Sequence, residues 1–450
     1  MKYYEDLVEK GATVDFVRSV IHEHKHSLLY NDAVIAYEYF CKRNITIRQY
    51  RKVLYNLLGE AHIDPISANY KFCNAFFPIF VKQENAFLLG NGVTFNKPDT
   101  KARLGDDDFD SKIFIAGEYA LWGAVSFCFF NYDHVDVFKV TEFAPLFSIE
   151  DGSMRAGVRF WQVAPNKPMR ATLYELDGYT EFIWRNGVGE ILKPKRAYTQ
   201  IVAQSVADGV EIRDGENYPA FPIVPLWANR EHQSEFAGLR EKIDGYDLIQ
   251  SGLANDLDTA QIYWIINNAG GMDEIDLAKF INQIKRVGAA VIEEDGAHAE
   301  SHTINIPYQA RQVGLSELKD SLYRDAMAVD DEKITSGNIT ATAINAAYKN
   351  LNLKCDGYEY CVSDCIRKIL KLLNIDDKPT FYRSQDTNQA EMTQVVLSAA
   401  DHLDEETILT LLPFISIDRV KTILKRKEEE DISRYSDETD EKDASSIGFV

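Results

Sequence analysis

Proline is missing from a long stretch of this 450-residue chain. None occurs between Pro225 and Pro307, although the chain holds 13. Because proline interrupts helices, its absence permits long ones. Apolar residues recur there at spacings of three, four and seven, which predicts a helix over residues 239–268 that is about 45 Å long. Helices are also predicted over 309–329 and 340–373, with a kink at Gly357 in the last one.

Positive charge is also scarce. The chain has 49 Lys and Arg residues against 70 Asp and Glu residues, a formal net charge of −21. A monomer this acidic repels DNA and acidic membranes, although acidity can also serve solubility alone. Uncharged runs are short, with 14 residues each over 119–132 and 259–272 and 15 over 334–348, which is too few to span a bilayer. The opening MKYYEDLVEK carries charges where a secretory signal has its apolar core, so export is not expected.

Cysteines are few and lack the CxxC pairs of redox and zinc sites. Cys355, Cys361 and Cys365 fall on one predicted helix, so a metal site is conceivable there, but no histidine lies nearby. The other three lie in apolar segments and are expected to be buried thiols: Cys41, Cys73 and Cys128. The chain therefore has the character of a cytosolic, reduced protein.

Most of the common catalytic motifs are absent. The chain has no GxxxxGK[ST] phosphate loop and no GxSxG or GxGxxG motif, although HEHKH (22–26) fits the pattern HExxH. His22 and His26 share a helix face and could bind a metal, but a solvated face is the simpler interpretation. Acidic residues 106–110 with His134 could form a hydrolase site. Carboxylates also favour the positive end of a helix dipole, which explains the acidic run without chemistry.

The predicted elements divide the chain into several regions. Helical spacing covers 4–29, 32–42, 46–58, 67–87 (with Pro78 as a break) and 107–122. Residues 127–206 alternate with period two and contain turn signals such as Asp151-Gly152 and Asn186-Gly187, which predicts an antiparallel sheet. A short helix (273–286) and two strands (287–294 and 298–306) follow residue 268, and the hairpin-turn signal Asp295-Gly296 lies between the strands. Small helices are predicted at 389–400, 405–411 and 417–426, before an acidic tail of the composition typical of disorder.

Four segments resemble the portal proteins of tailed bacteriophages, in the subfamily of long-tailed phages. The sharpest is IDGYDLIQSGLANDLDTAQIYW (243–264), which is similar to a family pattern of "IDAYD", a serine, then "AN" and an acidic residue. FPIVPLWAN (221–229), ANYKFCNAFFPIFVKQENAFLLGNGVTF (68–95) and a segment ending in LLPF (408–414) resemble three others. The four occur in the family's order, within residues 30–430.

The resemblance implies an α+β portal-protein fold, assembled as a ring of twelve subunits around a channel. Its parts would be the N-terminal α/β wing (1–236), a first stem helix (237–269), a clip (270–307), a second stem helix (308–329), a tunnel loop (330–339), a long kinked wing helix (340–383), a helical crown (384–427) and an acidic, disordered tail (428–450). Two clip strands are too few to be stable alone, so we expect them to pair with a neighbouring subunit.

The resemblance also implies a function. The ring would sit at one capsid vertex, where double-stranded DNA is packaged and ejected without sequence recognition. It would dock the terminase large subunit and then a head-tail adaptor, and would contact the major capsid and scaffolding proteins. No catalysis, cofactor, metal or membrane is implied, and the protein would occur in the host cytoplasm during assembly and then in the virion. The alternatives are another ring-forming virion connector or adaptor, or the hydrolase above.

Charge gives this function a physical reason. Twelve copies carry a formal charge of 12 × −21 = −252, and an acidic bore would let DNA slide, whereas Lys and Arg would bind its phosphates. The implied tunnel-loop residues are Asp330, Asp331, Glu332, Lys333, Ile334, Thr335, Ser336, Gly337, Asn338 and Ile339. The implied residues for clip docking or oligomerisation are Lys279, Lys285, Arg286, Glu293, Glu294, Asp295 and Gly296. An ordinary interhelical connection and surface solubility are the respective alternatives.

Overall fold

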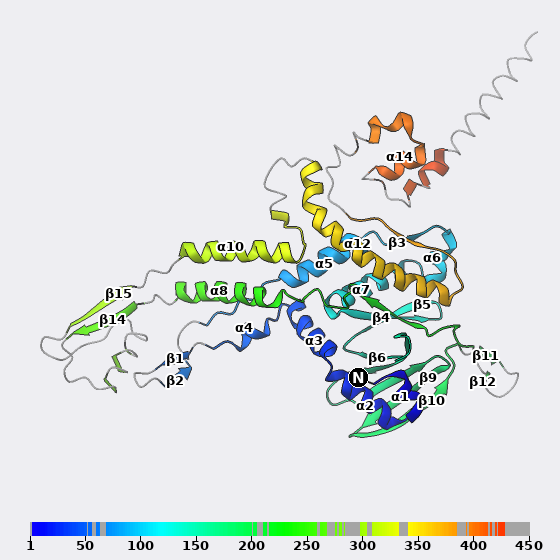
Figure 1. The fold of residues 1–450 in the computed structure, drawn as a ribbon, viewed down its shortest axis with the longest axis horizontal. Helices are drawn as coiled ribbons and strands as arrows, with labels where there is room; N and C mark the ends of the chain where they lie inside the picture. Colours follow the sequence, from blue (N-terminus) through cyan, green and yellow to red (C-terminus); the bar gives the residue numbers. More distant parts are fainter. Residues whose placement is uncertain are drawn as a thin grey trace, which may run out of the picture.

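The structure, a computed structural model, describes most of the chain. The described residues are 2–51, 53–55, 60–63, 69–199, 201–204, 210–213, 216–258, 262–267, 275–276, 279–280, 283, 298–303, 308–332, 341–384, 393, 396–412, 415, 419–420 and 422–427. Figure 1 shows a mixed α and β body from which one pair of helices projects. The predicted combination of helices and antiparallel strands is confirmed.

The largest sheet has five antiparallel strands in the order β10-β9-β8-β7-β6. They are β6 (Phe143–Phe147), β7 (Met154–Trp161), β8 (Met169–Glu175), β9 (Gly178–Arg185) and β10 (Val188–Arg196). Asn186 and Gly187 join β9 to β10 with φ of 51° and 83°, the left-handed conformations that a two-residue hairpin needs. Helices α1 (Tyr4–Lys10) and α2 (Val14–Lys25) pack on the sheet through a core that includes Val17 and Val158.

A second core lies between helices and a three-stranded sheet of order β13-β4-β5. Its elements are α3 (Leu28–Phe40), α5 (Phe76–Leu89), α7 (Asp107–Gly123), β4 (Val125–Asn131), β5 (His134–Lys139), β13 (Ile223–Trp227) and α12 (Ala341–Leu372). The Tyr358 hydroxyl of α12 donates to Asn85 Oδ1 of α5 at 2.9 Å. A Cβ on Gly117 of α7 would lie 2.1 Å from that hydroxyl oxygen, so the close approach of the three helices requires glycine.

Short elements complete the fold. They are α4 (Ile45–Gln49), β1 (Val53–Tyr55), β2 (Ala61–Ile63), β3 (Val93–Phe95), α6 (Pro98–Leu104), β11 (Ile201–Gln204), β12 (Val210–Arg213), β16 (Pro379–Phe381), the 3₁₀ turn η1 (Ala400–His402) and α14 (Glu405–Leu411). The pairs β1–β2, β11–β12 and β16–β3 are antiparallel. Among the described residues, no helix is both long and apolar enough to cross a membrane.

Three helix predictions in the N-terminal part were wrong in extent. The helix over 4–29 is two helices, because Gly11 takes φ +71° and the Thr13 side chain accepts a hydrogen bond from the Phe16 amide to begin α2. The helix over 46–58 ends at Gln49, and β1 pairs with β2 instead. The helix over 67–87 begins at Phe76, which places Pro78 in the first turn, where its missing N–H costs no intrahelical bond.

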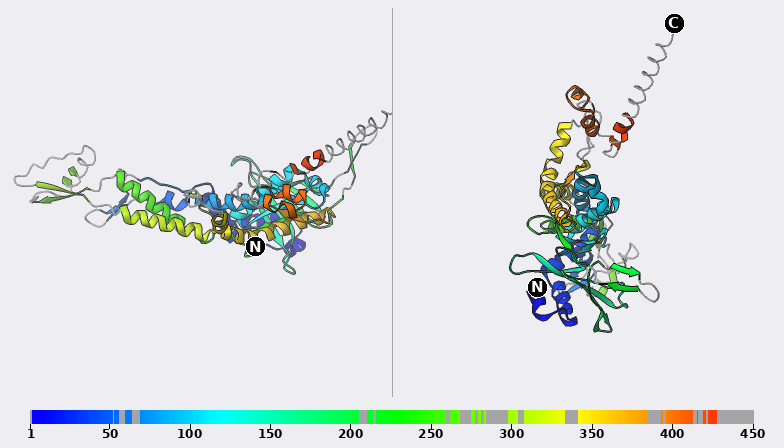
Figure 2. Two further views of the ribbon diagram at one scale, coloured as in Figure 1. Left: turned by 90° about the horizontal axis from the view of Figure 1, so that it is seen from above. Right: turned by 90° about the vertical axis from the view of Figure 1, so that its right-hand side faces the viewer.

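The projecting helix pair, which we call the arm, consists of α8 (Arg240–Asp258) and α10 (Tyr308–Asp325). Figures 1 and 2 show it extending away from the sheets, with two strands beyond its end. The predicted helix over 239–268 was therefore too long: α8 ends at Asp258, and β14 (Ile262–Asn267) pairs with β15 (His298–Thr303). Ile262–Asn267 is rich in β-branched and aromatic residues, which favour strands, and a nearly continuous apolar run also satisfies helical spacing.

The predicted pairing of strands 287–294 and 298–306 needs the same correction. The partner of β15 in the structure is β14, and residues 287–294 lie outside the described residues. Residues 275–276, 279–280 and 283 are helical, as predicted for 273–286, and α10 and α12 confirm two long helices. Figure 1 shows α12 changing direction along its length. Helix α14 matches the predicted helix over 405–411, and the acidic tail 428–450 lies outside the described residues.

Candidate functional site at the base of the arm

The arm is held together by ion pairs at both ends. Lys242 of α8 pairs with Asp325 of α10 and donates to Ser321 Oγ at 2.8 Å. At the other end Arg311 of α10 pairs with Asp256 of α8. These contacts join the start of each helix to the end of the other, so α8 and α10 are antiparallel.

A segment from the N-terminal part, residues 69–74, runs along α8 and is named here the anchor segment. Every second backbone amide of this segment donates to a side chain of α8. The amide of Asn74 donates to Asp247 Oδ1 at 3.1 Å, that of Phe72 to Ser251 Oγ at 3.0 Å and that of Tyr70 to Asn255 Oδ1 at 2.6 Å. We call this set of three bonds the amide ladder.

The amide ladder depends on a match between two repeats. Four residues of α-helix rise about 6.0 Å, since each residue adds 1.5 Å. Two residues of extended chain rise about 6.6 Å. The acceptors at positions 247, 251 and 255 are therefore spaced almost as the amides at 74, 72 and 70 are, with the two chains running in opposite directions. Asp, Ser and Asn are short side chains that accept hydrogen bonds, as each position requires.

Asp247 is the most buried member of the ladder, with 0% of its surface exposed. Besides the amide of Asn74 it accepts from the side chains of Asn74 at 2.6 Å and Asn44 at 2.8 Å. Burial raises the pKa of Asp247 above its ordinary value, while the bonds from Asn74 and Asn44 oppose the rise. One turn earlier, Asp244 accepts from the Tyr39 hydroxyl of α3 at 2.6 Å. The IDGYD motif thus joins α8 to α3, to Asn44 and to the anchor segment.

A buried charged cluster lies where both arm helices meet the body. Lys354 of α12 contacts Glu84 Oε2 of α5 at 2.7 Å and Glu235 Oε2, in the loop before α8, at 2.6 Å. It also donates to the carbonyl of Ala326, directly after α10, at 3.1 Å. One ammonium group therefore joins α12, α5 and the adjoining ends of both arm segments.

The cluster holds two carboxylates for one cation, which affects their protonation. Burial, opposed by Lys354 and reinforced by Glu235, raises the pKa of Glu84 to about 7. Burial acts to lower the pKa of Lys354, but Glu84 and Glu235 outweigh it and raise that pKa above its ordinary value. The ammonium stays charged at neutral pH, and Glu84 loses its proton as the pH rises through about 7.

The start of the predicted tunnel loop is fixed by α10. Lys319 lies 3.5 Å from Asp330 and 2.5 Å from Glu332, and Asp331 and Glu332 are helical. Two carboxylates of the predicted loop are therefore paired with a lysine of the arm. The remaining loop residues lie outside the described residues: Lys333, Ile334, Thr335, Ser336, Gly337, Asn338 and Ile339.

Of the predicted clip residues, only Lys279 belongs to the described part of the chain. It pairs with Asp276, three residues earlier, at 3.0 Å. Lys285, Arg286, Glu293, Glu294, Asp295 and Gly296 lie outside the described residues. Their docking role stays a prediction.

The candidate hydrolase residues have structural partners. Asp110 lies 2.7 Å from Lys101 and accepts from the Val93 amide at 3.1 Å. Among the described residues, the ion pairs of His134 are with Asp133 and Asp136, both from its own hairpin, and none is with residues 106–110. The acidic run supplies the first turn of α7, as the helix-dipole explanation predicts.

The candidate metal ligands His22 and His26 lie together, with ring centroids 4.3 Å apart, and His26 Nδ1 is in hydrogen-bond contact with the His22 carbonyl at 2.7 Å. His24, between them in the sequence, is buried and bonds the Val140 carbonyl at 2.7 Å. All six cysteines are free. No group of three or more potential ligands that could hold a metal occurs in the part of the chain that the structure describes.

Comparison with known proteins identifies the family. Residues 208–433 match the family model described as "Phage portal protein, SPP1 Gp6-like". The portal protein of Bacillus phage SPP1 is 25% identical over 455 aligned residues, covering 91% of this chain and 85% of that protein. The portal protein of Clostridium phage phiCD119 is 25% identical over 232 residues, 49% of this chain; the match spans 51% of that protein, about half its length.

Solved structures give weaker likenesses. A chain from the neck of a native gene transfer agent particle, computed with C12 symmetry, has a TM-score of 0.42 at 12% identity, covering 82% of this chain and 98% of that one. A chain from the virion of the native gene transfer agent particle has a TM-score of 0.38 at 15% identity, covering 75% of this chain and 89% of that one.

Replacing Asp247 tests the amide ladder. Asp247→Ala leaves the buried donors of Asn44 and Asn74 without their acceptor, so we expect a loss of roughly 2–4 kcal/mol in the free energy of unfolding. Denaturant unfolding measures it. Asp364→Ala is the matched control, because it breaks only an exposed pair with Lys368 and should change stability by less than about 1 kcal/mol. Equal effects of the two variants would refute the role given to Asp247.

Glu84 predicts a pH dependence of stability. Its pKa is about 7 in the folded chain against an ordinary value of 4.5, so the folded state binds a proton more tightly than the unfolded state does. The contribution of Glu84 to the free energy of unfolding is fully present below pH 4.5 and is lost as the pH rises through 7, a change of up to roughly 3 kcal/mol.

The measurement is the free energy of unfolding at pH 5 and pH 8. In Glu84→Gln this part of the decline should disappear, whereas Glu317→Gln, an exposed substitution on α10, should keep it. An identical decline in the original chain and in Glu84→Gln would contradict the assignment.

Proposed function

We propose that this chain, which belongs to the SPP1 Gp6-like family of phage portal proteins, forms a ring of about twelve copies at one capsid vertex. Double-stranded DNA passes through the ring during packaging and ejection. The ring docks the terminase large subunit during packaging and a head-tail adaptor afterwards, and contacts the major capsid and scaffolding proteins. It is assembled in the host cytoplasm and has no catalytic activity of its own.

The arm is the observation that carries this proposal. Two antiparallel helices project from the body and hold a two-stranded sheet beyond their end (Figure 1). A two-stranded sheet is marginally stable alone, and its edges invite pairing with another chain. A ring of arms side by side provides such neighbours. Polar side chains at the arm base bind the arm to the body, and a protein that transmits force requires such an attachment.

The parts of the proposed portal follow from this arrangement. The body with its two sheets is the wing, α8 and α10 are the stem, and residues 259–307 with β14 and β15 are the clip. This moves the start of the clip back from residue 270, because β14 begins at Ile262. Helix α12 is the kinked wing helix, residues 384–427 are the crown, and residues 333–339 reach the channel as the tunnel loop.

The paired carboxylates refine the charge argument. Lys319 pairs with Asp330 and Glu332 at the base of the proposed tunnel loop, so repulsion of DNA by these two groups is weakened. The acidic excess of the chain, −21 overall, supports a channel along which DNA slides.

The mass of the purified chain tests the ring directly. Native mass spectrometry should give about twelve times 51.2 kDa, and electron microscopy should show a central hole. The ring alone should not hydrolyse ATP or cut DNA. A monomer or dimer that persists at high protein concentration would remove the basis of the proposal.

Deletion of residues 336–338 tests the tunnel loop. Shortening the loop should leave ring formation intact but reduce DNA packaging or retention, because the contact with DNA in the channel is lost. The measurement is the amount of nuclease-protected DNA in assembled heads. A matched deletion in the exposed β7–β8 turn, residues 165–167, should leave packaging unchanged. Normal packaging and retention in both variants would leave the loop without a special role.

A further inference from the structure

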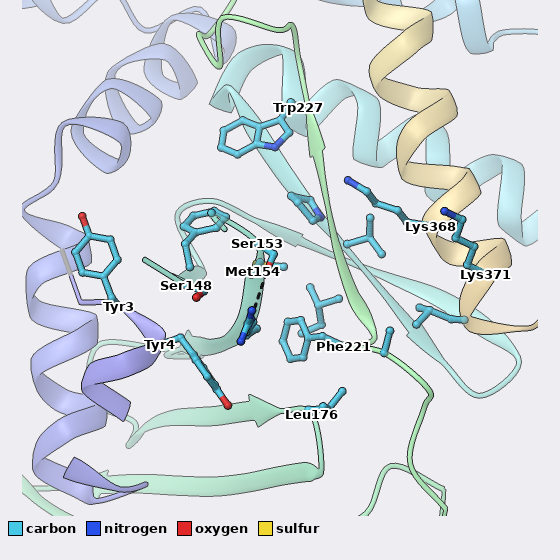
Figure 3. Close-up of a pocket in the computed structure, with 18 of the residues that line it drawn as sticks. Tyr3, Tyr4, Ser148, Ser153, Met154, Leu176, Phe221, Trp227, Lys368 and Lys371 are labelled. Atoms are coloured by element: carbon cyan, nitrogen blue, oxygen red, sulfur yellow. Dashed lines mark hydrogen bonds between the residues drawn. The ribbon is translucent and has the colours of Figure 1, made fainter. Parts of the chain in front are cut away.

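A large groove lies between the five-stranded sheet and the second core. Its volume is about 1260 Å³, and it is lined by the start of α1, the β6–β7 turn, β13 and the end of α12 (Figure 3). Phe221 and Trp227 line it from the β13 side, and Ile149 and Leu176, which are 66% and 51% exposed, from the sheet side. An exposed apolar groove of this size is typical of a binding site.

The charge of the groove is opposite to that of the chain. Of the described residues that line it, Arg155, Lys368 and Lys371 are charged, and none is Asp or Glu. Figure 3 shows Lys368 and Lys371 reaching from α12 on one side of the groove. Arg155 and Lys368 also pair with Asp151 and Asp364 at 2.9 and 2.7 Å, but exposed pairs of this kind are weak and exchange partners at little cost. The groove therefore favours an acidic occupant with apolar side chains.

We propose that the groove binds the C-terminal segment of this chain, residues 428–450. That segment holds nine acidic and two basic side chains, and it ends in the apolar residues Ile447, Phe449 and Val450. It thus combines acidic charge to pair with the lysines and apolar side chains to cover Phe221 and Trp227. Burial of these apolar side chains stabilises the contact by about 25 cal/mol for each Å² of apolar surface removed from water.

The segment is long enough for this contact. Its 23 residues span at most about 80 Å when extended. Figures 1 and 2 place the C-terminal helices on the α12 side of the molecule, away from the five-stranded sheet, and α12 carries both groove lysines. The segment would then connect the crown to both sides of the groove. The proposal does not depend on the proposed function, because binding can be measured in the purified chain in any oligomeric state.

Photo-cross-linking in the full-length chain tests the contact. Phe449→p-benzoylphenylalanine places a photoreactive group at the apolar end of the segment, and mass spectrometry of the digested protein identifies the attached residues. Attachment is expected on groove residues, with Ile149, Leu176 and Phe221 among them. Attachment mainly to residues outside the groove would overturn the proposal.

Charge reversal supplies the matched comparison. Lys368→Glu with Lys371→Glu should lower groove attachment and weaken binding of the peptide 428–450 to a chain ending at Lys427. Two pairs at roughly 0.7 kcal/mol each correspond to about tenfold in Kd. Lys349→Glu with Arg367→Glu makes the same change of charge on exposed α12 residues outside the groove lining and should weaken binding less than about twofold.

Two further results separate binding from misfolding. Thermal unfolding checks that both double variants remain folded. Raised salt should weaken binding of the peptide to the unmodified groove, because charge contributes to binding. The proposal fails if the groove reversal and the control reversal weaken peptide binding equally. It also fails if a peptide of the same composition in scrambled order binds as well as the native one.

Discussion

The arm depends on the amide ladder, in which side chains of a helix satisfy the backbone of a chain that has no strand partner. Unpaired backbone amides are costly when buried, and the anchor segment meets this requirement with Asp247, Ser251 and Asn255 instead of a sheet. Both partners are ordered by the same contact: α8 gains a fixed direction from the body, and residues 69–74 gain a fixed path. The Lys354 cluster then fixes the base of the arm, where α8 leaves the body and α10 returns to it.

Much of the fold could be predicted because helices and hairpins are local. The spacing of apolar residues gave α7, α10 and α12, and Asn186-Gly187 marked its hairpin turn. Prediction failed where a local pattern permitted two structures. Ile262–Ile266 is an unbroken apolar run, which is compatible with helical spacing. It forms a strand instead, because β15, some 30 to 40 residues later in the chain, supplies its partner. Pro78 was expected to break a helix that in fact begins next to it.

The site was less predictable, because its partners are distant in sequence. The sequence motif of α8 was recognised, but its side chains bond to residues 173 to 185 positions away in the chain. The periodicity of a sequence does not predict such a pairing. The Lys354 cluster was missed altogether. Its one local signal is Glu84, a charged residue among the buried positions of α5. A buried charge requires a partner, but the sequence does not indicate where that partner is. The Lys319 pairs of Asp330 and Glu332 were missed for the same reason.

Because the amide ladder reads the main chain, it places few demands on the side chains of the anchor segment. Tyr70 and Phe72 are 49% and 42% exposed, and almost any residue there would present the same N–H group to α8. Proline is the exception, since it has no N–H to donate. Positions 70 and 72 should therefore tolerate substitution by almost any residue except proline, whereas the three α8 positions must keep side chains that accept hydrogen bonds. In a set of related sequences the contact would then be visible as restricted variation on α8, but not in the anchor segment.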